Sequence, residues 1–73
     1  MLGIIELNKH RYSLAATGIK FKDREFLSRQ VAEQELYRVL DKNHLYIKKI
    51  YDDKHYKTYI CSNGVRFYIN RVF

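Results

Sequence analysis

Cysteine is almost absent from this sequence. The chain of 73 residues has only one, Cys61, so no disulfide can form within it. Small secreted domains usually depend on disulfides, and a lone thiol is more typical of a reducing compartment. We therefore expect a cytoplasmic protein that folds on a single hydrophobic core, close to the lower size limit for such a core. A domain this marginal is also suited to forming a homodimer or to binding a larger partner.

Long apolar runs are missing too. A membrane-spanning helix needs roughly 20 consecutive apolar residues, and the apolar segment at residues 1–5 is too short for a signal peptide. We therefore expect no membrane partner and no targeting segment. Glycine is scarce, and the three glycines, at positions 3, 18 and 64, do not form a phosphate-binding loop.

Potential metal ligands are few and scattered. Structural zinc sites use four ligands, usually in short-spaced pairs. The histidines and the cysteine form no such pair: His10, His44, His55 and Cys61. The sequence therefore predicts no metal and no cofactor.

Acidic residues are outnumbered by basic ones, 8 against 14, which gives a formal net charge of +6. An excess of this size favours polyanionic partners, chiefly RNA or DNA, or an acidic protein surface. Small domains also carry a comparable charge for solubility alone. The charge leaves these interpretations open.

The dipeptide Asn63-Gly64 lies between two alternating, β-rich runs. This pattern predicts a hairpin with a two-residue type I′ turn, because both central residues of that turn need a positive φ. In such a hairpin Ser62 faces Val65. A polar turn at residues 52–55 joins the hairpin to a third strand, so residues 44–73 are predicted to form a three-stranded antiparallel meander.

The turn also predicts which side chains share a face of the hairpin. With Ser62 opposite Val65, Ile60 lies opposite Phe67 on the core face, which Ile47, Tyr51 and Ile69 share. The other face combines tyrosines and cations without a carboxylate. Its candidate binding residues are Tyr46, Lys48, Lys57, Tyr59, Arg66 and Tyr68.

A sheet face of this kind suits RNA, because aromatic rings stack on bases while Lys and Arg contact phosphates. We therefore expect non-catalytic RNA binding, with DNA as a related ligand. The alternatives are a protein-binding surface, or a face that is simply solvated or covered by residues 1–22. A metal-independent ribonuclease is a less favoured alternative, which would use His55, Lys57, Tyr59, Arg66 and Tyr68.

A helix is predicted over residues 28–42. Ser28 is a suitable N-cap, and apolar residues recur at the spacing of one helical face: Ala32, Leu36, Val39 and Leu40. Residues 1–22 are predicted to form one strand or a hairpin of two. The predicted fold is therefore a single α+β domain over residues 1–73, with the order β(β)αβββ and the helix packed on the meander.

In composition and layout the chain resembles the small accessory proteins of T4-like tailed bacteriophages. It has no proline, is rich in Lys, Tyr, Asp and Asn, and closes with the run from Tyr59 to Arg71. The resemblance implies expression in a bacterial cytoplasm. It also implies a role in redirecting a host process, by binding nucleic acid or as an inhibitor or adaptor of a host protein. It assigns no site residue.

Overall fold

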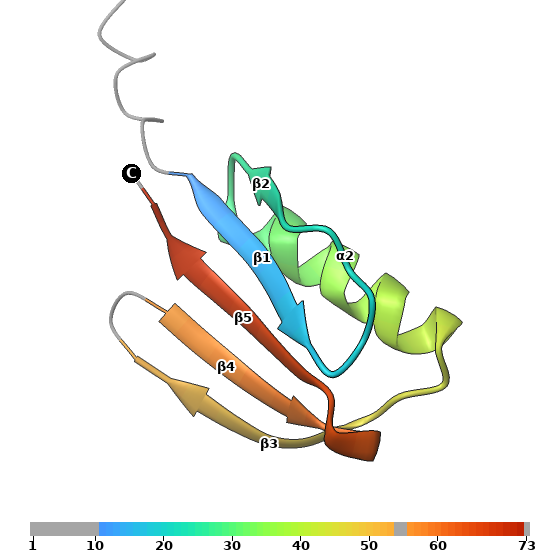
Figure 1. Cartoon of the computed structure of the whole chain (residues 1–73). Coiled ribbons are helices and arrows are strands. Elements are labelled where there is room, and N and C mark those ends of the chain that lie inside the picture. The colour runs from blue at the N-terminus through green and yellow to red at the C-terminus, as the bar shows by residue number, and fades with distance from the viewer. Residues whose placement is uncertain (1–10, 54–55, 73) are drawn as a thin grey trace, which may run out of the picture.

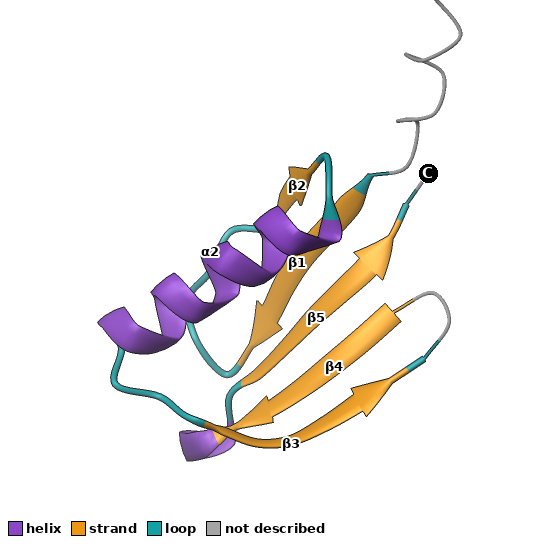
Figure 2. Cartoon of the chain, turned by 180° about the vertical axis from the view of Figure 1, so that it is seen from behind, coloured by secondary structure: helices purple, strands orange, loops and turns teal. Residues whose placement is uncertain are grey.

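The computed structural model describes residues 11–53 and 56–72. Within them lie one α-helix, one short 3₁₀ turn at Ser62–Gly64 and five strands. Their bounds are β1 (Tyr12–Thr17), β2 (Arg24–Phe26), α2 (Arg29–Lys42), β3 (Ile47–Asp52), β4 (Tyr56–Cys61) and β5 (Arg66–Arg71). The strands form one antiparallel sheet in the order β2-β1-β5-β4-β3. In Figure 1 the sheet lies in front of α2, and in Figure 2, seen from behind, α2 lies in front of it. The α+β fold and the predicted order of elements are confirmed.

The N-terminal part is a hairpin. β1 pairs with β2 on one side, with Tyr12 opposite Phe26. On its other side β1 pairs with β5 over its whole length, from Tyr12 opposite Arg71 to Thr17 opposite Arg66. The second strand of the hairpin begins at Arg24, beyond the predicted boundary at residue 22. The predicted strand assignment for residues 1–10 lies outside the described residues.

The predicted helix is confirmed within one residue. Ser28 is the N-cap, and its hydroxyl accepts a hydrogen bond from the backbone N–H of Val31 at 3.2 Å. The four residues of the predicted apolar face are all buried: Ala32, Leu36, Val39 and Leu40. The left-handed residue that follows the helix is His44, with φ of 56°, rather than Asn43.

The position of the helix on the sheet differs from the prediction. α2 packs mainly on β1, β2 and β5, and Figure 2 shows β3 and β4 beyond its edge. The prediction placed it over the meander because only the meander was expected to offer a broad apolar face. β1 adds Leu14, which is fully buried and lies opposite the buried Ile69 of β5, and the helix packs on this enlarged apolar surface.

The turn at Asn63-Gly64 has the predicted geometry. Asn63 has φ 59° and ψ 26°, and Gly64 has φ 73°. The backbone N–H of Val65 donates to the carbonyl of Ser62 at 3.2 Å. Positive φ at both central residues together with this bond defines a type I′ turn.

The predicted strand register beside this turn is wrong by one residue. Cys61, rather than Ser62, donates its N–H to the carbonyl of Val65, at 2.8 Å. The N–H of Ser62 donates instead to the carbonyl of Tyr46 at 2.9 Å, and the Ser62 hydroxyl accepts from the Tyr46 N–H at 3.2 Å. Ser62 is therefore an extra residue on the β4 side, held by the chain that leads into β3.

The shift exchanges the two faces of β4, because successive side chains of a strand point to opposite sides. Tyr59 lies opposite Phe67, and Ile60 lies opposite Arg66. Tyr59 is therefore buried against the helix side and Ile60 is not, the reverse of the prediction. β3 carries a second irregularity between Ile47 and Lys49.

This irregularity also corrects the predicted face of Tyr51. Ile47 pairs with Cys61 on the helix side, whereas Tyr51 pairs with Thr58 on the opposite side. The helix-side core therefore includes Phe67, Ile69 and Ile47, as predicted, but neither Ile60 nor Tyr51.

Core truncation should be costly in so small a domain. We expect Leu36→Ala and Phe67→Ala each to lower the free energy of unfolding by roughly 2 to 5 kcal/mol, since both side chains are fully buried. Urea denaturation measures the change. Val31→Ala, at an exposed position of α2, is the matched control and should cost less than about 1 kcal/mol. A core variant as stable as this control would contradict the packing.

Two glycines with positive φ should respond differently to alanine. A Cβ on Gly18, with φ of 82°, would lie 2.6 Å from the carbonyl oxygen of Gly64, whereas a Cβ on Gly64 would meet nothing within 4 Å. Gly64→Ala should therefore cost about 1 to 2 kcal/mol from its backbone alone. Gly18→Ala should cost more, by about 1 kcal/mol or above, because the clash adds to the strain. Equal losses in urea denaturation would argue against this close approach.

Candidate functional site

The face of the sheet opposite α2, which we call the open face, carries most of the exposed aromatic side chains of the sheet. The ladders place these residues of the meander on it: Lys49, Tyr51, Tyr56, Thr58, Ile60, Arg66, Tyr68 and Asn70. Of the six candidate residues taken from the sequence, Arg66 and Tyr68 lie on this face. None of the helices or strands that the structure describes covers it (Figure 1).

Three tyrosines on the open face surround Thr58. Thr58 lies opposite Tyr51 on one neighbouring strand and opposite Tyr68 on the other. Tyr56 is two residues before Thr58 on the same strand and therefore shares its face. Tyr51 and Tyr56 are 50% and 49% exposed, and Tyr68 is half-buried. We call Tyr51, Tyr56 and Tyr68 the tyrosine group.

The charges near the tyrosine group have both signs. The Lys49 Nζ lies 5.0 Å from the centroid of the Tyr51 ring, a cation–π contact. Arg66 is exposed at the start of β5, the strand that carries Tyr68. A hydrogen bond between the Tyr56 hydroxyl and Asp53 raises the pKa of Tyr56. The meander residues of the open face include no carboxylate, but Asp53, which follows β3, borders the face at Tyr56.

Two predicted site residues, Lys57 and Tyr59, lie on the helix side instead. Tyr59 is fully buried, and its hydroxyl donates to Glu33 Oε2 at 3.1 Å. Its burial and the nearby Glu33 charge raise the pKa of Tyr59, which keeps the phenol neutral. Lys57 Nζ lies 3.5 Å from the same Glu33 oxygen and 3.8 Å from Asp52. Both side chains tie β4 to α2 and are not presented to a ligand.

The last two predicted site residues are exposed but lie outside the tyrosine group. Tyr46, 65% exposed, precedes β3, and Lys48 occupies the irregular step of β3. The ladder assigns neither of them a partner.

The residues proposed for a ribonuclease do not share one face. Arg66 and Tyr68 are on the open face, Lys57 and Tyr59 are on the helix side, and His55 lies outside the described residues. Cys61 is buried, and burial raises the pKa of its thiol. Within residues 11–53 and 56–72, no group of three His, Cys, Asp or Glu side chains is placed to hold a metal ion. No helix in the same ranges is long and apolar enough to cross a membrane.

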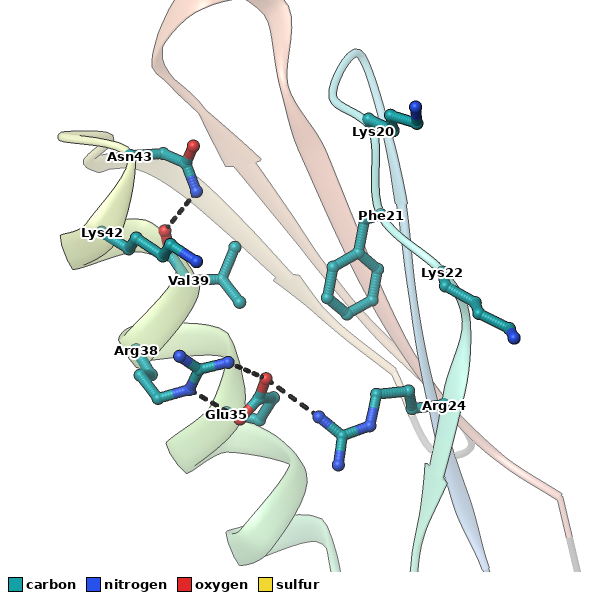
Figure 3. Close-up of a pocket in the computed structure, with 9 residues that line it drawn as sticks. All are labelled: Lys20, Phe21, Lys22, Arg24, Glu35, Arg38, Val39, Lys42 and Asn43. Atoms are coloured by element: carbon teal, nitrogen blue, oxygen red, sulfur yellow. Dashed lines mark hydrogen bonds and ion pairs between the residues drawn. The ribbon is translucent and has the colours of Figure 1, made fainter.

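A second candidate site lies on the helix side and was not predicted. It is a cleft of about 340 Å³ between α2 and residues 20–24, which we call the basic cleft (Figure 3). Its lining consists of Lys20, Phe21, Lys22, Arg24, Glu35, Arg38, Val39, Lys42 and Asn43. One signal was present in the sequence, since two of the cations, Arg38 and Lys42, are spaced by one helical turn. Their partners come from an irregular segment, whose position no periodicity reveals.

Among the described residues that line the basic cleft, Glu35 is the one carboxylate. It accepts hydrogen bonds from Arg38 Nε at 3.0 Å, Arg38 Nη2 at 2.6 Å and Arg24 Nη1 at 3.1 Å. The hydrogen bonds from Arg38 and the nearby positive charges hold the pKa of Glu35 below its ordinary value. The carboxylate therefore stays ionised and orients both guanidinium groups.

Comparisons with known proteins found no family model, no curated protein and no solved structure that matches this chain.

The Tyr59 hydroxyl provides a direct test of the corrected register. Tyr59→Phe removes its hydrogen bond to Glu33, a charged acceptor, and should lower the free energy of unfolding by roughly 1 to 2 kcal/mol in urea denaturation. The matched control is Tyr51→Phe, at an exposed position of the open face, which should change stability by less than about 0.5 kcal/mol. The reverse order of the two effects would favour the register expected from the sequence.

Proposed function

We propose that this protein binds RNA in single-stranded form, without catalysis, through the open face. The observation that carries the proposal is the tyrosine group: three rings gathered around Thr58 on a sheet face that no described element covers. The formal net charge of +6 supports a polyanionic ligand.

The spacing of the rings suits separate bases. Tyr51 and Tyr68 are anchored on strands two steps apart, a distance of about 10 Å at ordinary strand spacing. Stacking of one base on one ring contributes roughly 1 to 3 kcal/mol and tolerates any base, because every base has a π-face. Bases inside a duplex are already stacked on each other, so exposed rings favour unpaired RNA.

The cations of the open face are placed to contact phosphates. Arg66 lies two residues before Tyr68 on β5, and Lys49 lies two residues before Tyr51 on β3, so each cation is the next side chain along the same face. Two cations beside three aromatic rings predict modest electrostatic affinity, with stacking as the larger contribution.

A fluorescence-anisotropy titration tests the proposal, with a labelled 12-nucleotide uridine strand that carries a 5′-hydroxyl. Tyr51→Ala and Tyr68→Ala should each weaken binding by about 1 to 3 kcal/mol and leave its salt dependence unchanged. Arg66→Ala should reduce the slope of log affinity against log salt by about 0.7, the value for one phosphate contact on a single strand. The tyrosines and the cation thus have separable signatures.

Tyr37→Ala is the matched control, because Tyr37 is 51% exposed but lies on α2. It should bind like the unaltered protein, and circular dichroism should show every variant folded. Equal losses in the Tyr37 and Tyr51 variants, or equal affinity for duplex and single strand, would contradict the proposal. If the protein shifts no RNA at low salt but retains one stoichiometric protein from nuclease-treated bacterial lysate, the partner of the open face is a protein and not RNA.

A further inference from the structure

Three cations line the inside of the basic cleft, and two of them meet at one carboxylate. Figure 3 shows the guanidinium groups of Arg24 and Arg38 turned toward Glu35, and the ammonium of Lys42 reaching toward Val39 in the same cleft. Lys20 and Lys22 also line the cleft, but Figure 3 shows both directed away from α2. They add positive charge at the rim.

The charges of the described residues that line the cleft do not balance. Glu35 neutralises one of the three inner cations, Arg24, Arg38 and Lys42, which leaves a formal excess of two positive charges before the rim lysines are counted. The Glu35 side chain is 14% exposed and is held by both arginines. Its hydrogen bonds use Arg24 Nη1 together with Arg38 Nε and Nη2. Arg24 Nη2 and Arg38 Nη1, as well as the ammonium of Lys42, are thus not used by Glu35.

The cleft also has an apolar wall. Phe21 and Val39 lie between the rim lysines and the cations of α2 (Figure 3). The Phe21 ring is held by an edge contact with the Phe67 ring, with centroids 5.9 Å apart. A volume of about 340 Å³ lies at the lower end of the range for small-molecule sites, which combine apolar walls with a few convergent polar groups.

We propose that the basic cleft is a binding site for a phosphate monoester, separate from the open face and on the other side of the sheet. A monoester carries about −1.5 to −2 charges at neutral pH, which matches the excess inside the cleft, whereas a diester of the nucleic-acid backbone carries less. Planar guanidinium groups suit phosphate oxygens, and Lys42 adds a point charge. The organic part of the ligand packs on Phe21 and Val39. This chemistry is shared by a free nucleoside monophosphate and the 5′-phosphorylated end of an RNA strand.

The test uses ³¹P chemical shifts and isothermal titration of the full chain with uridine monophosphate, with uridine as the uncharged control. Lys42→Ala should weaken binding of the monophosphate roughly tenfold, the effect of losing one charge-assisted contact. Lys48→Ala removes an exposed lysine that does not line the cleft and should leave the affinity unchanged. Equal effects of these two substitutions would overturn the proposal, as would equal binding of uridine.

Glu35→Gln distinguishes a ligand site from an ion pair that only joins α2 to β2. It removes the one negative charge of the cleft while keeping an acceptor for the arginines, so affinity for the monophosphate should rise several-fold. A purely structural ion pair predicts a lower melting temperature and no gain in affinity. No gain in affinity, whatever the melting temperature, would overturn the proposal.

The source of the phosphate is decided with two RNA strands of the same sequence. Tighter binding of the 5′-phosphorylated strand than of the 5′-hydroxyl strand, lost in Lys42→Ala, identifies an RNA end as the ligand. Equal binding of the two strands, with uridine monophosphate still bound, identifies a free nucleotide. Tyr51→Ala should leave uridine monophosphate binding unchanged, so failure of this site and failure of RNA binding on the open face are distinguishable.

Discussion

One serine sets the arrangement of side chains on both faces of the sheet. Ser62 donates its N–H to the carbonyl of Tyr46, and its hydroxyl accepts a hydrogen bond from the Tyr46 N–H. The pairing with the carbonyl of Val65 is left to Cys61. β4 is therefore offset by one residue against β5. Because side chains alternate along a strand, the offset buries Tyr59 on the helix side of the sheet and turns Ile60 and Thr58 toward the open face. The tyrosine group exists because Thr58, rather than Tyr59, lies between Tyr51 and Tyr68.

The second constraint is the position of the helix. α2 lies over β1, β2 and β5, where Leu14 of β1 and Phe67 of β5 are both fully buried. Its outer edge then lies against residues 20–24, and the basic cleft forms there. Its other edge is joined to β4 by Glu33, which contacts both Tyr59 and Lys57. The helix thus makes charged contacts along both edges, through Glu35 with Arg24 of β2 and through Glu33 with Lys57 of β4.

The two candidate surfaces differ in their chemistry. The open face presents three tyrosines with Lys49 and Arg66, so stacking should dominate there. The basic cleft presents converging cations around Glu35, whose ionised state is favoured by the same cations, so charge should dominate there. The tyrosine group lies on the face of the sheet opposite α2, whereas the basic cleft lies between α2 and residues 20–24, and the two share no residue.

The sequence alone determined the elements that depend on neighbours along the chain. The apolar spacing from Ala32 to Leu40 defined the helix, and Asn63-Gly64 defined the turn, because helix periodicity and positive φ are local properties. The register was not local: it was decided by Ser62 meeting Tyr46, which is 16 residues away. The basic cleft likewise needed tertiary structure, since Arg24 and Arg38 meet on Glu35 only after the β1–β2 hairpin and α2 pack together. Composition predicted a basic, tyrosine-rich surface, but long-range hydrogen bonds decided which residues form it.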